Sequence, residues 1–200
     1  MGLAEKIGHG LAHADRTLMK GVNASVQAYN WTTGGTKAQL ANNLQTLGAI
    51  TLSFGAGINL GVLKGVFFAT AALPSAHITQ SYNVDIERDE DNAISKGLKD
   101  SSVEISKNMR AFGGYLFMAI PLISSSSYFD SDVSSFEKIG RSVIDLAFVS
   151  WGLSHHVMRA DYLPPRKNCV FRGVDALKKA YKKYEEQNSL EPALLNSRMF

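Results

Sequence analysis

Residues 38–63, AQLANNLQTLGAITLSFGAGINLGVL, decide the fold class, because these 26 consecutive positions carry no formal charge. A helix that crosses a bilayer needs about 20 predominantly apolar residues. Three further stretches without charge follow, at 65–84, 111–129 and 146–158, and the last is the shortest. The sequence therefore predicts an all-α integral membrane protein, a helical bundle of about four transmembrane helices.

The first two stretches are separated by one charged residue, Lys64. As a single helix, residues 38–84 would be about 70 Å long, roughly twice the thickness of a bilayer. We therefore predict a hairpin of helices at roughly 37–56 and 60–78, with its turn in GAGINLG. A re-entrant segment at 60–78 stays open as an alternative. The two later stretches predict a second hairpin around SSSSYFDSDVSS.

Three helix starts carry the same pattern, a Ser or Thr followed three positions later by Glu or Gln. In this capping box the hydroxyl accepts from a free amide of the first turn, and the Glu or Gln reaches back to another. The pattern begins at Thr36, Ser101 and Ser134. Each occurrence lies shortly before an apolar run, so we expect helices to begin near these residues.

Both ends of the chain predict helices outside the apolar runs. Residues 3–29 repeat apolar residues at steps of three or four, which predicts an amphipathic helix on the membrane surface or against the bundle. The segment DALKKAYKKYEEQ predicts a second helix, whose basic face comprises Lys178, Lys179, Lys182 and Lys183. Anionic headgroups attract such a face at about 1 kcal/mol per charge. No base-reading motif accompanies it, so we predict no nucleic-acid partner.

These patterns divide the chain into five segments. They are an amphipathic N-terminal helix and turn at 1–35, the first transmembrane hairpin at 36–84, a polar connector at 85–100, the second helical hairpin at 101–163 and a basic tail at 164–200. The connector, DIERDEDNAISKGLKD, mixes both signs of charge at high density. Such mixed runs are typical of solvated loops, and a loop is what we predict there.

The distribution of charge predicts the orientation in the membrane. The chain has 21 Lys and Arg residues, which crowd both of its ends, whereas acidic residues dominate the loop at 124–138. Because cytoplasmic segments carry the excess of Lys and Arg, we expect both termini in the cytoplasm. An even number of spans is then required, which four spans satisfy.

Histidines are the conspicuous reactive groups. His9 and His13 share one helix face, a suitable spacing for two metal ligands, but the sequence offers no obvious third. His155 and His156 end an apolar segment, and histidines there are candidate haem ligands. They also lie near Arg159, at the interface, where histidine is ordinary. We therefore predict neither a metal nor a cofactor.

Two charges in the last apolar segment form a candidate structural ion pair. Arg141 and Asp145 are four positions apart, so they share a helix face. The motifs GxSxG, Walker A and GxGxxG do not occur in the sequence. With the single cysteine Cys169, the chain forms no internal disulfide. No catalytic residue is predicted.

The sequence thus predicts a non-enzymatic membrane scaffold or accessory subunit that acts through helix and lipid contacts. Its expected partners are the bilayer, anionic headgroups, and other membrane proteins or a second copy of itself. One alternative is a small transporter or channel that uses Lys64, Arg141 and Asp145. Another is a soluble all-α bundle, which the mean hydropathy of −0.07 also allows.

Overall fold

The computed structural model describes residues 3–95, 101–124, 132–161, 163 and 166–196. Within these ranges the chain forms six α-helices and no strand. The helices are α1 (Leu3–Thr33), α2 (Lys37–Leu60), α3 (Val62–Ser95), α4 (Ser101–Ser124), α5 (Ser135–Arg159) and α6 (Cys169–Asn196). The prediction of an all-α helical bundle is confirmed.

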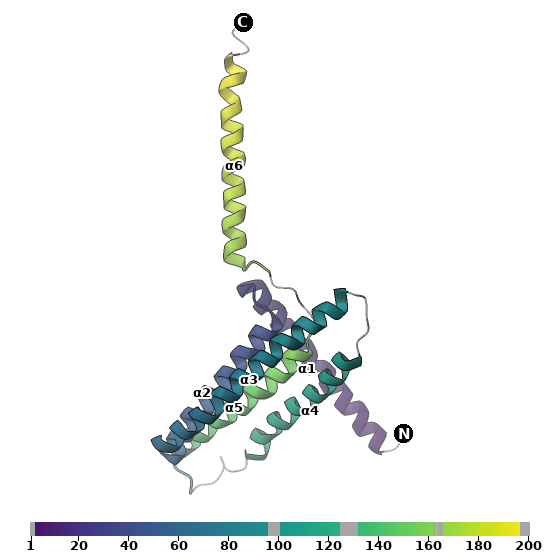
Figure 1. Ribbon diagram of the computed structural model, residues 1–200, viewed down its shortest axis with the longest axis vertical. Helices are drawn as coiled ribbons and strands as arrows, with labels where there is room; N and C mark the ends of the chain where they lie inside the picture. The colour runs from purple at the N-terminus through teal and green to yellow at the C-terminus, as the bar shows by residue number, and fades with distance from the viewer. Residues whose placement is uncertain (1–2, 96–100, 125–131, 162, 164–165, 197–200) are drawn as a thin grey trace.

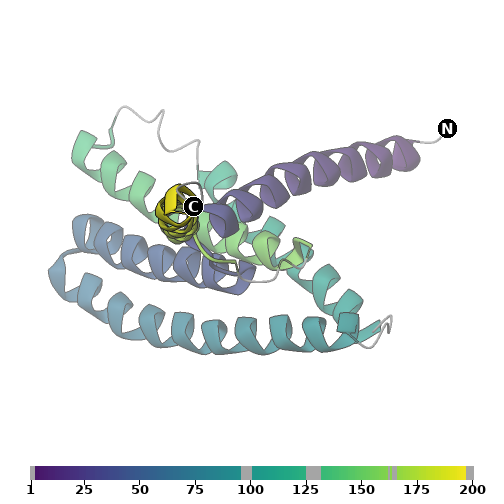
Figure 2. The ribbon, with the colours of Figure 1, turned by 90° about the horizontal axis from the view of Figure 1, so that it is seen from above.

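Four helices form the bundle. Helix α2 packs against both α3 and α5, and α4 packs along α5 (Figure 1). Helix α1 crosses one end of this group, where it contacts α2 and α5 (Figure 2). Helix α6 points away from the bundle and contacts α1 near its base, where the Arg172 guanidinium donates to the Trp31 carbonyl at 2.7 Å.

The three predicted helix starts are confirmed, since α2, α4 and α5 begin at Lys37, Ser101 and Ser135. At the first start the full capping box is present. The hydroxyl of Thr36 accepts from the Gln39 amide at 3.3 Å, and the Gln39 side chain accepts from the Thr36 amide at 3.1 Å. At the start of α5 the Ser134 hydroxyl accepts from the Glu137 amide at 3.2 Å, which is the first of the two bonds of the box.

The first hairpin turns at a single glycine. Helix α2 ends at Leu60 and α3 begins at Val62, so only Gly61 separates them. Its φ of +92° lies in a region that side-chain-bearing residues rarely adopt, which is why glycine suits this turn. The predicted turn in GAGINLG is confirmed at its last residue.

Small residues bring the helices of the bundle close together. The buried apolar residues of α2, α3 and α5 are mainly alanines: Ala38, Ala41, Ala49, Ala56, Ala72, Ala76 and Ala147. A Cβ placed on Gly48 would lie 2.4 Å from the indole nitrogen of Trp151, so this glycine makes room for the ring. Small residues at helix contacts let backbones approach, as they do in membrane bundles.

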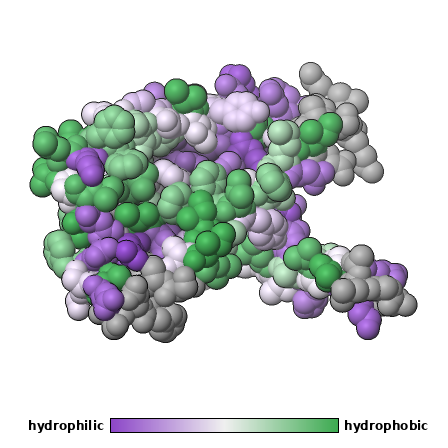
Figure 3. Space-filling view, turned by 90° about the horizontal axis from the view of Figure 1, so that it is seen from below, coloured by the Kyte–Doolittle hydropathy of each residue, from purple (hydrophilic) through white to green (hydrophobic). Residues whose placement is uncertain are grey.

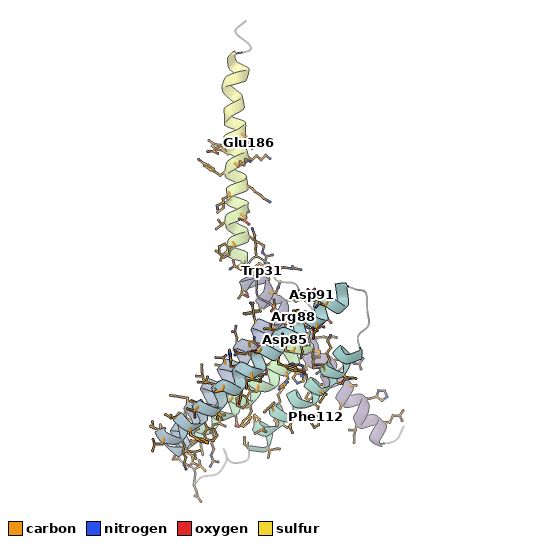
Figure 4. All side chains as sticks on the ribbon, in the orientation of Figure 1. Trp31, Asp85, Arg88, Asp91, Phe112 and Glu186 are labelled. Atoms are coloured by element: carbon orange, nitrogen blue, oxygen red, sulfur yellow. The ribbon has the colours of Figure 1, made fainter. Side chains whose placement is uncertain are left out.

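The prediction of a loop from residue 85 is wrong for residues 85–95, which continue α3 as a helix. The reason is that its charges have partners on the bundle. Glu90 is buried and paired with lysines of α2 and α4. On the exposed side, Arg88 pairs with Asp85 one turn away, and both lie at the same end of α3 (Figure 4).

By length and composition, one helix among the described residues, Val62–Asn92 in α3, could cross a membrane. The predicted four-span architecture is therefore not confirmed. The first half of α2 contains Asn42, Asn43 and Gln45, whose polarity lowers the hydropathy of that helix. The apolar run of α5 is only 13 residues long. Both helices nevertheless pack closely within the bundle.

Candidate functional site

A buried ion cluster joins four helices at one end of the bundle. The side chain of Lys37, at the start of α2, is 0% exposed. Its ammonium lies 2.5 Å from a carboxylate oxygen of Glu90 in α3, and the other oxygen lies 2.8 Å from the ammonium of Lys107 in α4. Lys37 also donates to the carbonyl of Ala160 at 2.7 Å, which caps the C-terminus of α5.

Polar side chains continue from this cluster into the bundle. The amide of Gln45 donates to the hydroxyl of Ser154 at 2.5 Å, and Gln45 is buried. Asn83 donates to the Asn42 side chain at 2.9 Å and accepts from the Arg110 guanidinium at 3.0 Å. Interior hydrogen bonds therefore link α2, α3, α4 and α5, in addition to two clusters of buried apolar residues.

A second charged group fastens α1 to the bundle. Two guanidinium nitrogens of Arg159 donate to the carboxylate oxygens of Asp15 at 2.9 and 3.0 Å. The hydroxyl of Tyr115 donates to the same carboxylate at 2.5 Å. The hydrogen bond from Arg159 lowers the pKa of Asp15 below its ordinary value, and the one from Tyr115 acts in the same direction. Asp15 is thus held in its charged form.

The histidine pair faces α4. His156 is 0% exposed, and its Nδ1 lies 2.9 Å from the Arg159 guanidinium. Because arginine only donates, this Nδ1 accepts, and the proton of the neutral ring is on Nε2. That atom lies against Gly114, where an added Cβ would be 2.6 Å away, and His155 lies beside Gly113. Two rings of α4 also contact the pair: Tyr115 lies 4.7 Å from the His156 ring and Phe117 stacks on the His155 ring at 5.6 Å, centroid to centroid.

The other candidate residues lie apart from this end. His9 and His13 are exposed on α1, and the described residues contain no group of three or more side chains suited to a metal ion. Lys64 is exposed near the start of α3. The structure gives Arg141 a different partner from the one we expected, since it pairs with Glu137 at 2.6 Å. An acidic residue four positions before the basic one is the favoured order on a helix. Asp145 accepts from the Ser124 hydroxyl at 3.0 Å.

The sequence patterns did not reveal the ion cluster or the attachment of α1. Lys37 and Glu90 are 53 positions apart, and Asp15 and Arg159 are 144 apart, on different helices. The one available signal was that Lys37 directly follows a helix cap and stands alone before a long uncharged stretch. Comparison with protein-family models, curated proteins and solved structures finds no match to this chain.

Proposed function

We propose that this chain is a small multi-pass membrane protein that acts as a non-enzymatic scaffold or accessory subunit. The observation that carries the proposal is the distribution of polarity in α2 to α5. Large apolar side chains lie on the outside of these helices, and charged and amide side chains lie between them. Water-soluble bundles have the opposite arrangement, because burial of apolar surface drives their folding.

The outer surface supports this proposal most directly. Large apolar side chains are exposed on all four helices, among them Ile50, Phe54, Phe67, Ile78, Met109, Phe112, Leu116, Leu122, Ile139 and Leu146. Figure 3 shows a broad apolar area across one face of the bundle. Monomeric soluble proteins rarely expose large apolar patches, whereas lipid chains and neighbouring membrane helices cover them well.

The interior supports it as well. Polar groups in a bilayer need partners within the protein, because no water is available there. The bonds from Gln45 to Ser154 and from Asn83 to Asn42 supply such partners between helices. The short runs in α2 and α5 then cross as part of a bundle, with Gln45 and Ser154 turned inward.

In the proposed orientation, the end of the bundle that carries Lys37 and Lys107 faces the cytoplasm together with both termini. Helix α6 leaves from this end and carries exposed lysines on one side. We propose that these lysines contact anionic headgroups. The turn at Gly61 then lies on the opposite side of the membrane.

Single cysteines test this orientation. In a Cys169→Ser background we expect Leu63→Cys to react with a membrane-impermeant maleimide on intact cells, because the neighbouring turn at Gly61 faces the outside of the cell. Lys179→Cys, on α6, should react only after the cells are lysed. Both parent positions are exposed, so burial does not explain a difference in labelling. Reaction of both cysteines from the same side would contradict the four-span orientation.

A further inference from the structure

A groove lies between α3 and α4. These two helices hardly touch each other, because α3 packs on α2 and α4 packs on α5. Two cavities of about 340 and 390 Å³ fill the space between them, and both are lined by Thr79 and His155. Each volume lies within the range of small-molecule sites. The two cavities are therefore adjoining parts of one groove.

The two parts of the groove differ in chemistry. The first part is mainly apolar, and its lining includes Leu52, Phe68, Ala72, Ala76, Phe117 and Trp151. The second part is lined by Tyr82, Ser106 and Arg110 as well as by apolar residues of α4. Arg110 lies one turn after Lys107, so the polar part is nearer to the buried ion cluster. The groove thus has an apolar part and a cationic part.

Arg110 is a buried cation that lacks an anionic partner in the described part of the chain. The residue is 8% exposed. One guanidinium nitrogen donates to Asn83, and the ring of Tyr82 lies 5.5 Å away, but the buried Nε has no hydrogen-bond partner. His155 adds a second buried nitrogen without a partner, its Nδ1. Buried charges in proteins are normally paired, so this site lacks an anion.

We propose that the groove between α3 and α4 binds a lipid with an anionic headgroup. The carboxylate or phosphate lies on Arg110, whose planar guanidinium matches both groups. The acyl chain lies along Phe68 and Trp151. This inference rests on the proposed membrane location, which brings the groove into contact with lipid. Both a free fatty acid and an anionic phospholipid supply the required chemistry.

Fluorescence of Trp151 tests the proposal. The chain has two tryptophans, so Trp31→Phe leaves Trp151, in the apolar part of the groove, as the only one. In detergent micelles we would titrate the protein with a fatty acid, a phosphatidic acid and a phosphatidylcholine, each brominated on its acyl chain. Bromine quenches indole fluorescence at short range. We expect saturable quenching by the anionic lipids, and phosphatidylcholine should need a concentration at least about tenfold higher.

The fatty acid and the phosphatidic acid distinguish the source of the anion, because the natural class saturates at the lower concentration. Arg110→Gln should raise the midpoint for that lipid at least about tenfold, since it removes the charge-assisted bond. The matched control is Arg88→Gln, which removes an exposed arginine of α3 and should leave the midpoint unchanged. Ala71→Phe narrows the first cavity from its exposed side while keeping Arg110, and should reduce the quenching.

Thermal unfolding of each variant shows whether it still folds, so a loss of lipid binding can be distinguished from a loss of structure. The anionic lipid should raise the unfolding temperature of the wild type and leave that of Arg110→Gln unchanged. Equal quenching by phosphatidylcholine and the anionic lipids would overturn the proposal, as would an unchanged midpoint in Arg110→Gln or no quenching at all. The lipid-binding measurements are made in micelles, whereas the orientation is tested by cysteine labelling on cells. A negative result in one experiment therefore does not decide the other.

Discussion

Replacing Glu90 by glutamine is expected to lower the free energy of unfolding by about 3–5 kcal/mol, because it leaves a buried charge without its counter-ion. Lys37 has no exposed side-chain surface, and after the change its acceptors in this cluster are two uncharged oxygens, the Ala160 carbonyl and the new side-chain amide. Thermal or denaturant unfolding in detergent micelles, followed by circular dichroism, measures the loss.

The reverse substitution should cost less. Lys37→Met leaves Glu90 with the ammonium of Lys107 at 2.8 Å, so the carboxylate keeps a partner. The double variant should recover part of the loss caused by Glu90→Gln, since neither buried charge then remains. Asp85→Asn is the matched control, because it breaks an exposed pair and should change stability by less than about 1 kcal/mol. Equal losses for Glu90→Gln and Asp85→Asn would contradict the role of the cluster.

Replacing Gly65 by alanine is expected to destabilise the first hairpin by about 1–3 kcal/mol, the usual cost of overpacking. A Cβ at this position would lie 2.8 Å from the Cα of Gly57 and 2.9 Å from the carbonyl oxygen of Ser53. Both atoms belong to the backbone of α2, so the helices must move apart. The fall in the unfolding temperature in detergent measures the effect.

The facing glycine provides the control. A Cβ on Gly57 would meet its nearest atom, the Cα of Gly65, at 3.8 Å, which is an ordinary contact. Gly57→Ala should therefore be tolerated and gain up to about 1 kcal/mol from the better helix propensity of alanine. Similar losses in the two variants would show that α2 and α3 are not packed as described.

The parts of the fold that could be predicted from the sequence depend on neighbouring residues. The cap at Thr36 involves residues no more than four positions apart in the sequence, and the turn at Gly61 needs a single residue. The lengths of α1 and α6 were predicted less well from the sequence. Helix α1 runs to Thr33, four residues beyond the predicted stripe, and α6 begins at Cys169, before the predicted segment. Both ends carry a local signal that the apolar stripe alone does not use: Gly34, with a φ of +77°, follows α1, and the Asn168 side chain accepts from the Phe171 amide at 2.9 Å at the start of α6.

The candidate site could not be predicted, because it depends on contacts between helices that are far apart in the sequence. Residues 85–95 have the composition of a solvated loop, but Glu90 among them faces two lysines from other helices. Similarly, the spacing of Arg141 and Asp145 allowed an ion pair. Glu137 is also four positions from Arg141, on its N-terminal side, and it is Glu137 that pairs with Arg141. Composition indicates which charges are present, and packing selects their partners.

The apolar exterior and polar interior are also properties of the assembled bundle. Asn42 and Gln45 weaken the case for a span when α2 is read alone. In the bundle these residues bond to α3 and α5. The prediction of membrane insertion therefore stands on the arrangement of several helices together, and it remains a prediction.

Extraction of membranes at alkaline pH tests the central claim most directly. The full chain is expressed, the cells are lysed, and the membrane fraction is washed with sodium carbonate, which removes proteins bound only at the surface. We predict that the chain stays in the pellet and is released by detergent. Recovery as a monodisperse monomer in the soluble fraction without detergent would contradict the account.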